Sequence, residues 1–551
     1  MKLYNPNFNL RALFLAIFIA FGSSSVSAQS NGFEVIRSLE LLDQIYENLE
    51  KYYVDDIETG NLSKVAIDAM LKELDPYTVY YHESNIEDYQ LMTTGQYGGI
   101  GALIRKIDDH VYISEPYEGN PAQNAGLHAG DKILEIDGKS MKDKSTDEVS
   151  KSLKGPKGTE VEVLVERVNG EKKTIKFERD EIKLKDVPYH GMIDGSIGYI
   201  KLNSFTKTAA SEVMTAYNDL VNQGMTKLVF DLRGNGGGLL IEAVKLVNMF
   251  VPKNQVVVTT KGRVEEENRT YKTMGDPKDL DIPLVVLVNG TSASASEIVS
   301  GTLQDLDRAV IVGKTSYGKG LVQRTYDLDY GSKIKLTIAK YYTPSGRCVQ
   351  RLEYYDREDG ERRKEIADSL VKVFKTKNGR DVIDGRGIEP DVEVKAKEFS
   401  RLTATIFREN LIFDFATEYF YKHESITAAD KFELKDDEYA AFKKYVLEHE
   451  FTYSTASEEM LKKMKETAEE EGFYEEASAE YEALMNKVVP SKERDLEKFK
   501  DEITRMLENE IVSRYYFQKG RAQHAFKDDK DIDKAVEILN DEKQYNTILG
   551  N

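Results

Sequence analysis

Residues 289–323 of this 551-residue chain read NGTSASASEIVSGTLQDLDRAVIVGKTSYGKGLVQ. The apolar run Leu284–Val288 just before them has the length and β-branched composition of a strand. A serine- and alanine-rich turn follows, and Ile298, Val299 and Leu303 then recur at helical spacing. A serine therefore sits where a strand becomes a helix. There its hydroxyl would be exposed beside free backbone N–H groups that can stabilise a developing oxyanion.

A serine hydroxyl needs a base to become a nucleophile at neutral pH. Of the seven histidines, only His190 lies near the segments that build this region. Lys319 is better placed, because Gly318 and Gly320 flank it and let the backbone pack closely. Apolar neighbours such as Val310 would desolvate the amine and lower its pKa, so Lys319 could act as a neutral base.

The same residues allow structural roles. Ser294-Ala295-Ser296-Glu297 fits a capping box, in which the serine caps the helix and the glutamate reciprocates. A lysine taken by itself is more often solvated than catalytic. The tetrapeptide alone therefore leaves a cap and a nucleophile both open, and the two roles are compatible.

The longer pattern resembles a family. Ser-Ala-Ser-Ala-Ser-Glu-Ile at 292–298, Gln304-Asp305, Arg308-Ala309, Gly318-Lys319-Gly320 and Gln323 resemble the active-site region of the carboxyl-terminal processing peptidases, or tail-specific proteases. The resemblance implies that Ser294 is the nucleophile, that Lys319 is the base and that Gln323 orients the lysine. It implies no metal and no cofactor.

The first residues are typical of a secretory signal peptide. Lys2 and Arg11 precede an apolar run at 12–21, and Val26-Ser27-Ala28 supplies a small-residue cleavage pattern. We expect residues 1–28 to be removed and the protein to be exported to the periplasm or cell envelope. An uncleaved membrane anchor is the alternative for this segment.

Composition agrees with an exported globular protein, and 551 residues exceed what one core usually organises, so we expect several domains. The formal net charge of −20 argues against nucleic acids and anionic membrane surfaces as partners. Cys348 is the only cysteine and forms no internal disulfide, and we expect it to be structural.

Residues 29–91 are predicted to form an N-terminal helical segment. Leu39, Leu42, Ile45 and Leu49 recur at helical spacing, and Leu-Asp-Pro-Tyr-Thr at 74–78 breaks the pattern at a turn. That string also resembles the family's N-terminal segment, and packing is its expected role.

Residues 92–182 are predicted to form a PDZ domain. The Ala-Gly-Asp-Lys-Ile-Leu string at 129–134 carries the resemblance, with alternating strands at 161–165 and 174–177. In a PDZ domain the loop of Gly99, Ile100, Gly101 and Ala102 would bind a substrate's C-terminus, and the peptide would add as a strand.

Residues 183–398 are predicted to form an α/β peptidase core, because strands and helices alternate. The turn Arg233-Gly234-Asn235-Gly236-Gly237-Gly238 is no dinucleotide fingerprint, since Leu239 occupies the third glycine position. It resembles the family segment that supplies an oxyanion-hole amide. Gly237 is the expected donor and Gly236 the second choice, joined by the N–H of Ala295.

Residues 399–551 are predicted to form a helical C-terminal extension. Its sequence suggests a packing or dimerising appendage, with a homo-oligomer or adaptor contact as its expected use.

Together these observations predict a multidomain α/β and α+β serine endopeptidase that captures protein substrates by apolar C-termini and forms an acyl-enzyme through a Ser294–Lys319 dyad. The competing hypotheses are an inactive PDZ scaffold, a hydrophobic-ligand binder on the same fold, and hydrolysis with His190 as the base.

Overall fold

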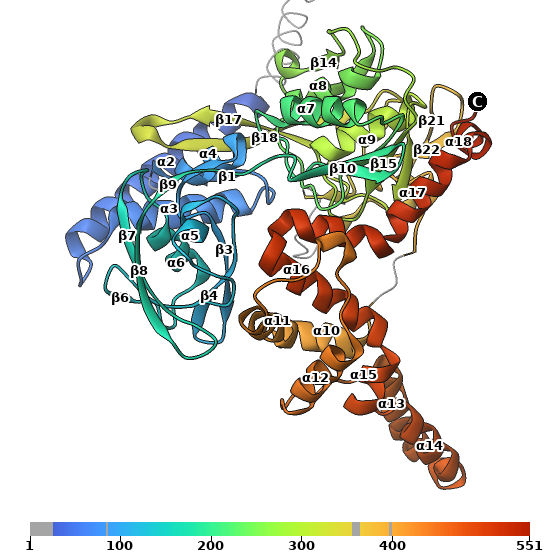
Figure 1. Cartoon of the computed structure of the whole chain (residues 1–551). Coiled ribbons are helices and arrows are strands. Elements are labelled where there is room, and N and C mark those ends of the chain that lie inside the picture. Colours follow the sequence, from blue (N-terminus) through green and yellow to red (C-terminus); the bar gives the residue numbers. More distant parts are fainter. Residues whose placement is uncertain (1–25, 84–85, 355–363, 396–398) are drawn as a thin grey trace, which may run out of the picture.

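The computed structural model describes residues 26–83, 86–354, 364–395 and 399–551 (Figure 1). The predicted signal peptide, residues 1–28, lies almost entirely outside the described residues. Its expected cleavage point after Ala28 falls within the first described helix, α2 (Val26–Tyr52). Of the helices in the described ranges, none is long and apolar enough to cross a membrane.

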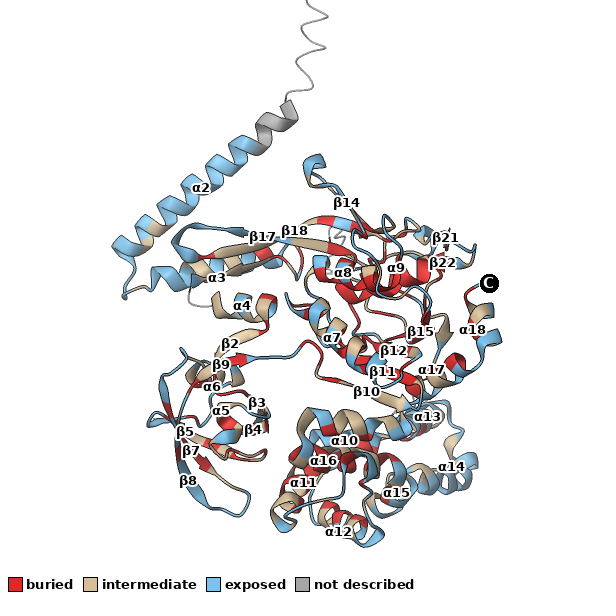
Figure 2. Ribbon diagram, turned by 45° about the horizontal axis from the view of Figure 1, so that its top comes forward, coloured by how far each residue is buried: buried red, intermediate tan, exposed pale blue. Residues whose placement is uncertain are grey.

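The N-terminal segment is helical, as expected. Its elements are α2, α3 (Thr59–Lys72), β1 (Val79–Tyr81) and α4 (Ile86–Thr94). Figure 2 shows α2 projecting from the molecule, with most of its described side chains exposed. The turn at 74–78 connects α3 to β1, and β1 pairs antiparallel with β18 (Lys333–Tyr342). This pairing brings the turn against the core of the protein.

Residues 102–178 form a small antiparallel sheet with a helix packed against it. The strand order is β3-β4-β5-β7-β8, so β3 lies at an edge. The elements are β3 (Ala102–Ile107), β4 (His110–Pro116), α5 (Pro121–Asn124), β5 (Lys132–Ile136), β6 (Lys139–Ser140), α6 (Thr146–Leu153), β7 (Glu160–Glu166) and β8 (Lys172–Glu178). Alternate side chains of β7, Val161, Val163 and Val165, are fully buried in its core. The short strands β2 (Gln96–Gly99) and β9 (Asp180–Lys183) pair where the chain enters and leaves this unit.

A six-stranded sheet organises the core, in the order β10-β11-β12-β15-β16-β23. All neighbouring strands are parallel except β10 and β11. The elements are β10 (Tyr189–Asp194), β11 (Ile197–Lys201), α7 (Ala209–Asn222), β12 (Lys227–Asp231), α8 (Leu240–Phe250), β15 (Leu284–Val288), α9 (Ala295–Asp305), β16 (Val310–Gly313) and β23 (Val392–Glu393).

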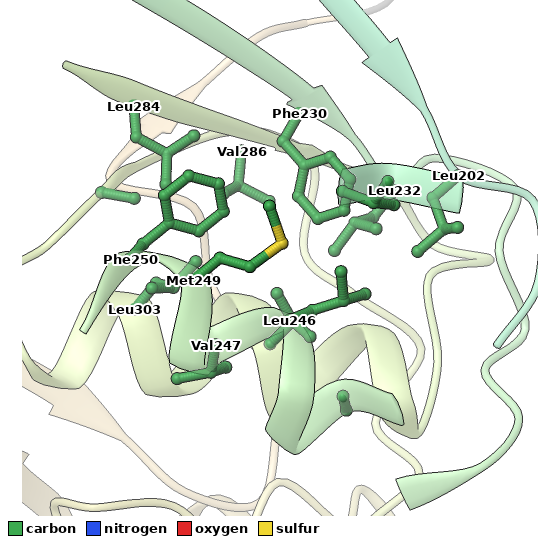
Figure 3. Close-up of a cluster of buried hydrophobic side chains, with 14 of the residues drawn as sticks. Leu202, Phe230, Leu232, Leu246, Val247, Met249, Phe250, Leu284, Val286 and Leu303 are labelled. Atoms are coloured by element: carbon green, nitrogen blue, oxygen red, sulfur yellow. The ribbon is translucent and has the colours of Figure 1, made fainter. Parts of the chain in front are cut away.

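One face of this sheet is covered by α7, α8 and α9. Phe230 and Val286 from the strands meet Leu246, Phe250 and other side chains of the helices in a cluster of buried apolar residues (Figure 3). A parallel sheet needs cover on both faces, since its strands are apolar on both sides. The alternation of strands and helices therefore explains only one of the two layers.

The second face is covered by the far end of the chain. Helix α17 (Lys530–Asn540) packs Ile532, Ile538 and Leu539 against Val285 and Val312 of the sheet. Burial of each of these α17 side chains contributes about 1.5–3 kcal/mol, so α17 is an integral layer of the core. The predicted C-terminal extension thus includes a structural part of the α/β unit.

A second, antiparallel sheet lies beside the first and contains β18 at its centre. Its further strands are β13 (Val256–Gly262), β14 (Arg269–Lys272) and β17 (Leu321–Asp327). Short elements complete the core: η2 (Glu265–Glu267), η3 (Asp329–Gly331), β19 (Leu352–Glu353), β20 (Lys364–Glu365), η4 (Asp368–Leu370), β21 (Val373–Lys375) and β22 (Asp381–Ile383).

The C-terminal region is helical. Its elements are α10 (Arg401–Arg408), α11 (Leu411–Lys422), η5 (Ala429–Lys431), α12 (Asp436–Leu447), α13 (Ala456–Glu471), α14 (Tyr474–Val488), α15 (Lys492–Lys498), α16 (Lys500–Ala525), η6 (Phe526–Asp528), α17 and α18 (Glu542–Ile548). Leu496, Ile503 and Leu507 are fully buried in a separate apolar core. Helix α16 is interrupted at Phe517, whose φ is 52° and ψ is −154°.

Candidate active site

Ser294 lies where β15 gives way to α9, immediately before the first helical residue. Its φ of 57° and ψ of −111° are rare for a residue other than glycine. Such a conformation costs about 1–3 kcal/mol and concentrates at functional sites. The structure thus places Ser294 at the strand-to-helix junction that the sequence indicated.

The capping interaction at Ser294 involves its backbone. Oε2 of Glu297 accepts a hydrogen bond from the Ser294 N–H at 2.7 Å. Ser294 and Glu297 form the capping box that the sequence indicated, with the Glu297 N–H facing the serine side chain, and the Ser294 hydroxyl donates no hydrogen bond within the described chain. The glutamate therefore fixes the serine backbone, while the hydroxyl stays available for chemistry.

Glu297 is a hub that the sequence indicated only as a cap. Besides Ser294, its carboxylate accepts from Ser316 Oγ at 2.6 Å, from the Gly318 N–H at 2.7 Å and from the Lys319 N–H at 2.9 Å. The side chain is fully buried, and burial raises its pKa despite these four donors. One carboxylate therefore ties the serine segment to the lysine segment.

Lys319 lies in the loop between β16 and β17, where its two glycine neighbours allow close packing. A Cβ on Gly320 would lie 2.7 Å from the Gln350 nitrogen, and one on Gly318 would lie 2.6 Å from Arg351 Cβ. The Lys319 Nζ lies 4.2 Å from the centre of the Tyr77 ring. It forms no ion pair with any described carboxylate.

The Lys319 amine is poised to lose its proton. Burial and then the positive charge of Lys335 lower its pKa to about 8, against the opposing attraction of Glu297 and Asp75. A lysine with this pKa is partly neutral near neutral pH, as a general base requires.

Gln323, on β17, is held by a hydrogen-bond chain from the N-terminal turn. Its Nε2 donates to Thr337 Oγ1 at 3.2 Å, and Thr337 Oγ1 donates to Asp75 Oδ1 at 3.2 Å. Asp75 also accepts from the N–H groups of Tyr77 and Thr78 at 2.8 Å. The turn at 74–78, expected only to pack, therefore borders both Lys319 and Gln323.

The glycine turn after β12 approaches the serine closely. A Cβ on Gly237 would lie 2.8 Å from Ser294 Cβ and 3.0 Å from the Ala295 nitrogen. The Gly237 N–H donates to Asn235 Oδ1 at 2.8 Å. In the described part of the chain, the N–H groups of Gly236 and Ala295 have no acceptor. The structure brings Gly236, Gly237 and Ala295 together, and the N–H groups of Gly236 and Ala295 are free.

A cavity of about 920 Å³ joins these groups. Its lining includes Ser294, Lys319 and Gln323, with Glu115 and Tyr117 from the 102–178 unit and Phe517, Gln518 and Lys519 from α16. The α16 residues carried no sequence signal, because they approach only through the interruption of that helix. The cavity therefore runs from the serine towards the predicted PDZ domain.

Two other predicted groups lie outside this lining. His190 faces α7, with its Nε2 3.4 Å from Asp219 Oδ2. Gly99, Ile100, Gly101 and Ala102 lead into the edge strand β3, where Ile100 is buried and its carbonyl accepts from the Ala122 N–H. Among the described residues, no group of three or more His, Cys, Asp or Glu is arranged to hold a metal.

Family comparisons match three parts of the chain. Residues 196–354 match the model of peptidase family S41, and residues 112–167 match a PDZ domain. Residues 402–539 match the model of a probable PDZ-protease, C-terminal helical domain.

An alignment with a relative over most of its length agrees with these family matches. The carboxy-terminal-processing protease of Bartonella bacilliformis is 36% identical over 349 residues, which cover 62% of this chain and 79% of that protein. The chain belongs to the carboxy-terminal-processing protease family. This membership confirms the predicted resemblance and the predicted fold class of a PDZ domain, an α/β peptidase core and a helical C-terminal domain.

Other members of the family align over less of their length. The probable CtpA-like serine protease of Staphylococcus aureus strain N315 is 38% identical over 315 residues, 57% of this chain and 62% of that protein. The chain thus spans less than two thirds of the Staphylococcus relatives. Among solved structures, the photosystem II D1 C-terminal processing protease has a TM-score of 0.36 and 28% identity, covering 64% of this chain and 86% of that chain.

Proposed function

We propose that this family member is an exported serine endopeptidase that binds the C-terminal tails of protein substrates through its PDZ domain and cleaves by a Ser294–Lys319 dyad. The observation that carries the proposal is the shared cavity, which both Ser294 and a Lys319 of lowered pKa line. Gln323, which lines the same cavity, is proposed to orient the lysine.

In the first step, Ser294 Oγ forms a bond to the substrate carbonyl carbon while its proton passes to Lys319 Nζ. The carbonyl oxygen becomes an oxyanion, which the Ala295 N–H and an N–H of the Gly236–Gly237 turn would stabilise. Of the two glycines, Gly236 has its N–H free, whereas the Gly237 N–H would first have to break its hydrogen bond to Asn235 Oδ1.

In the second step, the tetrahedral intermediate collapses and the carbon–nitrogen bond breaks. The leaving amine takes the proton back from Lys319, and the acyl group stays on Ser294 as an ester. Water then attacks the ester with Lys319 as base, which releases the acid product and restores the serine hydroxyl.

Substrate capture is proposed to occur at the free edge of β3. An extended tail can add there as a further strand, with its carboxylate near the loop at 99–102. We therefore expect the substrates to be proteins or peptides with apolar C-termini. A homo-oligomer or adaptor contact through the C-terminal helices stays a prediction.

Export to the periplasm or envelope is proposed from the N-terminal pattern alone. Cell fractionation, with N-terminal sequencing of the mature protein, tests it. A new terminus at Gln29 in the exported fraction would support a cleaved signal peptide, and a retained Met1 in the membrane fraction would contradict it.

Cleavage of an unfolded reporter with an apolar C-terminal tail tests the proposed reaction. We expect Ser294→Ala to abolish cleavage and amidation of the tail to weaken it. Tail binding without cleavage by the parent would favour an inactive scaffold, and unchanged cleavage by Ser294→Ala would exclude this nucleophile.

A further inference from the structure

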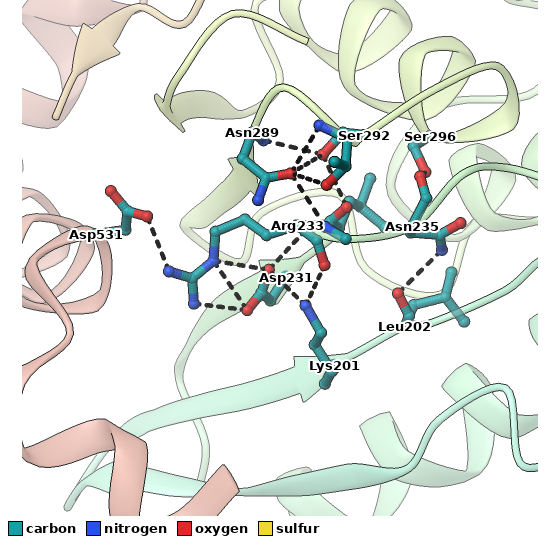
Figure 4. Close-up of polar contacts among 12 residues, drawn as sticks. Lys201, Leu202, Asp231, Arg233, Asn235, Asn289, Ser292, Ser296 and Asp531 are labelled. Carbon is teal, nitrogen blue, oxygen red and sulfur yellow. Dashed lines mark hydrogen bonds and ion pairs between the residues drawn. The ribbon is translucent and has the colours of Figure 1, made fainter. Parts of the chain in front are cut away.

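The Arg233 guanidinium is held by acidic groups from two distant parts of the chain (Figure 4). On the core side, Asp231 Oδ2 accepts from Arg233 Nη2 at 2.7 Å. On the other side, Asp531 Oδ2 lies 2.8 Å from Nη1, and Asp529 Oδ1 accepts from Nη1 at 2.9 Å. Asp529 Oδ2 also lies 2.8 Å from Nη2. Both acids beyond residue 500 precede or begin α17.

This cluster is shielded from solvent. The side chains of Arg233, Asp529 and Asp531 are 16%, 19% and 22% exposed. Burial alone would raise the pKa of Asp231, but Arg233 and Lys201 hold it well below its usual range. Ion pairs in such a setting fix geometry better than exposed pairs, because water competes less for their hydrogen bonds.

The position of α17 is itself fixed. Asp529 accepts hydrogen bonds from the N–H groups of Asp531 and Ile532 at 3.0 and 3.2 Å, which caps the helix. The apolar face of α17 is buried against the core sheet. The two carboxylates therefore reach Arg233 from a rigid element rather than from a loop.

Arg233 begins the glycine turn that faces the serine. Its carbonyl accepts from Lys201 Nζ, and Asn235 Nδ2 donates to the Leu202 carbonyl at 2.9 Å. The Asn235 carbonyl in turn accepts from the Ala293 N–H at 3.0 Å and from Ser296 Oγ at 2.9 Å. The turn and the serine segment thus form one hydrogen-bonded unit that starts at Arg233.

We propose that Asp529 and Asp531 are positioning residues for catalysis, which hold Arg233 and thereby fix the turn at 233–238 against the segment at 292–296. The inference rests on the proposed function, because its effect is on the oxyanion side of the Ser294 site. It means that the C-terminal helical domain completes the active site of its own chain.

The test compares two variants. The double variant carries both Asp529→Asn and Asp531→Asn, and the control carries Asp533→Asn alone. Asn caps a helix about as well as Asp, so the start of α17 is preserved. Asp533 lies on the same helix and is exposed, so it controls for loss of an acidic group there. Active enzyme is counted by labelling with a fluorophosphonate, which corrects for misfolded protein.

We expect the double variant to lose about tenfold or more in kcat per active site, with KM changed less than about twofold. Its affinity for a peptide aldehyde, which forms a tetrahedral adduct, should fall in parallel. Its affinity for an uncleaved tail peptide should match the parent's, since the PDZ domain is untouched. Asp533→Asn should behave as the parent.

A double variant whose kcat per active site equals that of Asp533→Asn would overturn the inference while leaving the proposed function intact. Equal losses of aldehyde and tail-peptide affinity would also overturn it, because they indicate a general structural role. A parent that neither cleaves the reporter nor takes the label would overturn both. If the double variant does not fold, Asp531→Asn alone keeps the cap residue and should show a smaller loss of the same kind.

Discussion

The backbone N–H groups of Ser294 and Lys319 donate to the same carboxylate oxygen, Oε2 of Glu297, at 2.7 and 2.9 Å. Two residues that are 25 positions apart are thereby held at a fixed separation by one buried acceptor. The proposed proton transfer between their side chains depends on this separation.

Glu297→Gln should damage both activity and stability. An amide nitrogen would face N–H and O–H donors that now meet a carboxylate, and each unsatisfied buried donor costs about 1–3 kcal/mol. We expect a lower melting temperature and a loss of kcat of about 100-fold. Thermal unfolding and kinetics per labelled active site measure the two effects, and the exposed Glu476→Gln on α14 is the control. Parent-like kinetics in Glu297→Gln would contradict the role assigned to this carboxylate.

The pH dependence of cleavage should report Lys319. Its ammonium form is inactive as a base, so kcat/KM should rise with pH through an apparent pKa of about 8. A profile of kcat/KM measured from about pH 6 to about pH 10 tests this, because that range runs from near the reference pKa of histidine to near that of lysine. A midpoint near that of free lysine would contradict a desolvated base, and loss of activity in a His190 variant would favour that residue as the base.

The same pKa shift has a consequence for stability. Because the folded-state pKa of Lys319 is lower than that of the unfolded chain, the unfolded state binds more protons between the two values. The contribution of Lys319 to stability should therefore rise with pH above about 8, so the parent should gain more stability, or lose less, than Lys319→Met. Urea unfolding of both at pH 7 and pH 10 measures this. Equal pH dependence in the two proteins would show that Lys319 is not perturbed.

Tyr77 should control the environment of Lys319. Tyr77→Leu removes the ring that lies 4.2 Å from Nζ and admits water. The regained hydration of the ammonium should outweigh the lost attraction of the ring, so the apparent pKa of Lys319 should rise and activity at neutral pH should fall. Tyr77→Phe keeps the ring and should keep the pH profile, which makes it the matched control. The prediction fails if both variants share the parent's profile.

Gly237 should tolerate no side chain. Its φ is 102°, and a Cβ would lie 2.8 Å from Ser294 Cβ, so Gly237→Ala should reduce kcat by about 100-fold. Gly234 also has a positive φ, of 78°, but a Cβ there meets nothing within 4 Å. Gly234→Ala therefore controls for backbone strain alone. Equal losses of kcat in both variants would contradict the claim that a side chain at Gly237 acts by crowding Ser294.

The sequence predicted what is local to each segment. The strand before Ser294, the helix after it and the glycines around Lys319 follow from short patterns, and the structure contains them. The capping motif also located Glu297. Its hydrogen bonds to the loop that carries Lys319 could not be predicted, because they depend on a contact between the β15–α9 segment and the β16–β17 loop.

Contacts between distant segments could not be predicted. Tyr77 reaches Lys319 only because β1 pairs with β18, and Asp529 reaches Arg233 only because α17 covers the sheet. The direction of the Gln323 amide, towards Thr337, likewise depends on the register of β17 and β18. Composition and periodicity carry no information on these pairings, since each segment is equally consistent with other neighbours.

Mass spectrometry of the trapped intermediate tests the central claim most directly. A tail-bearing peptide ester is mixed with the protein, the reaction is quenched in acid, and the peptide containing Ser294 is sequenced. The account predicts an added mass equal to the acyl fragment on Ser294, absent from Ser294→Ala. An acyl group on another residue, or turnover by Ser294→Ala at the parent's rate, would contradict it.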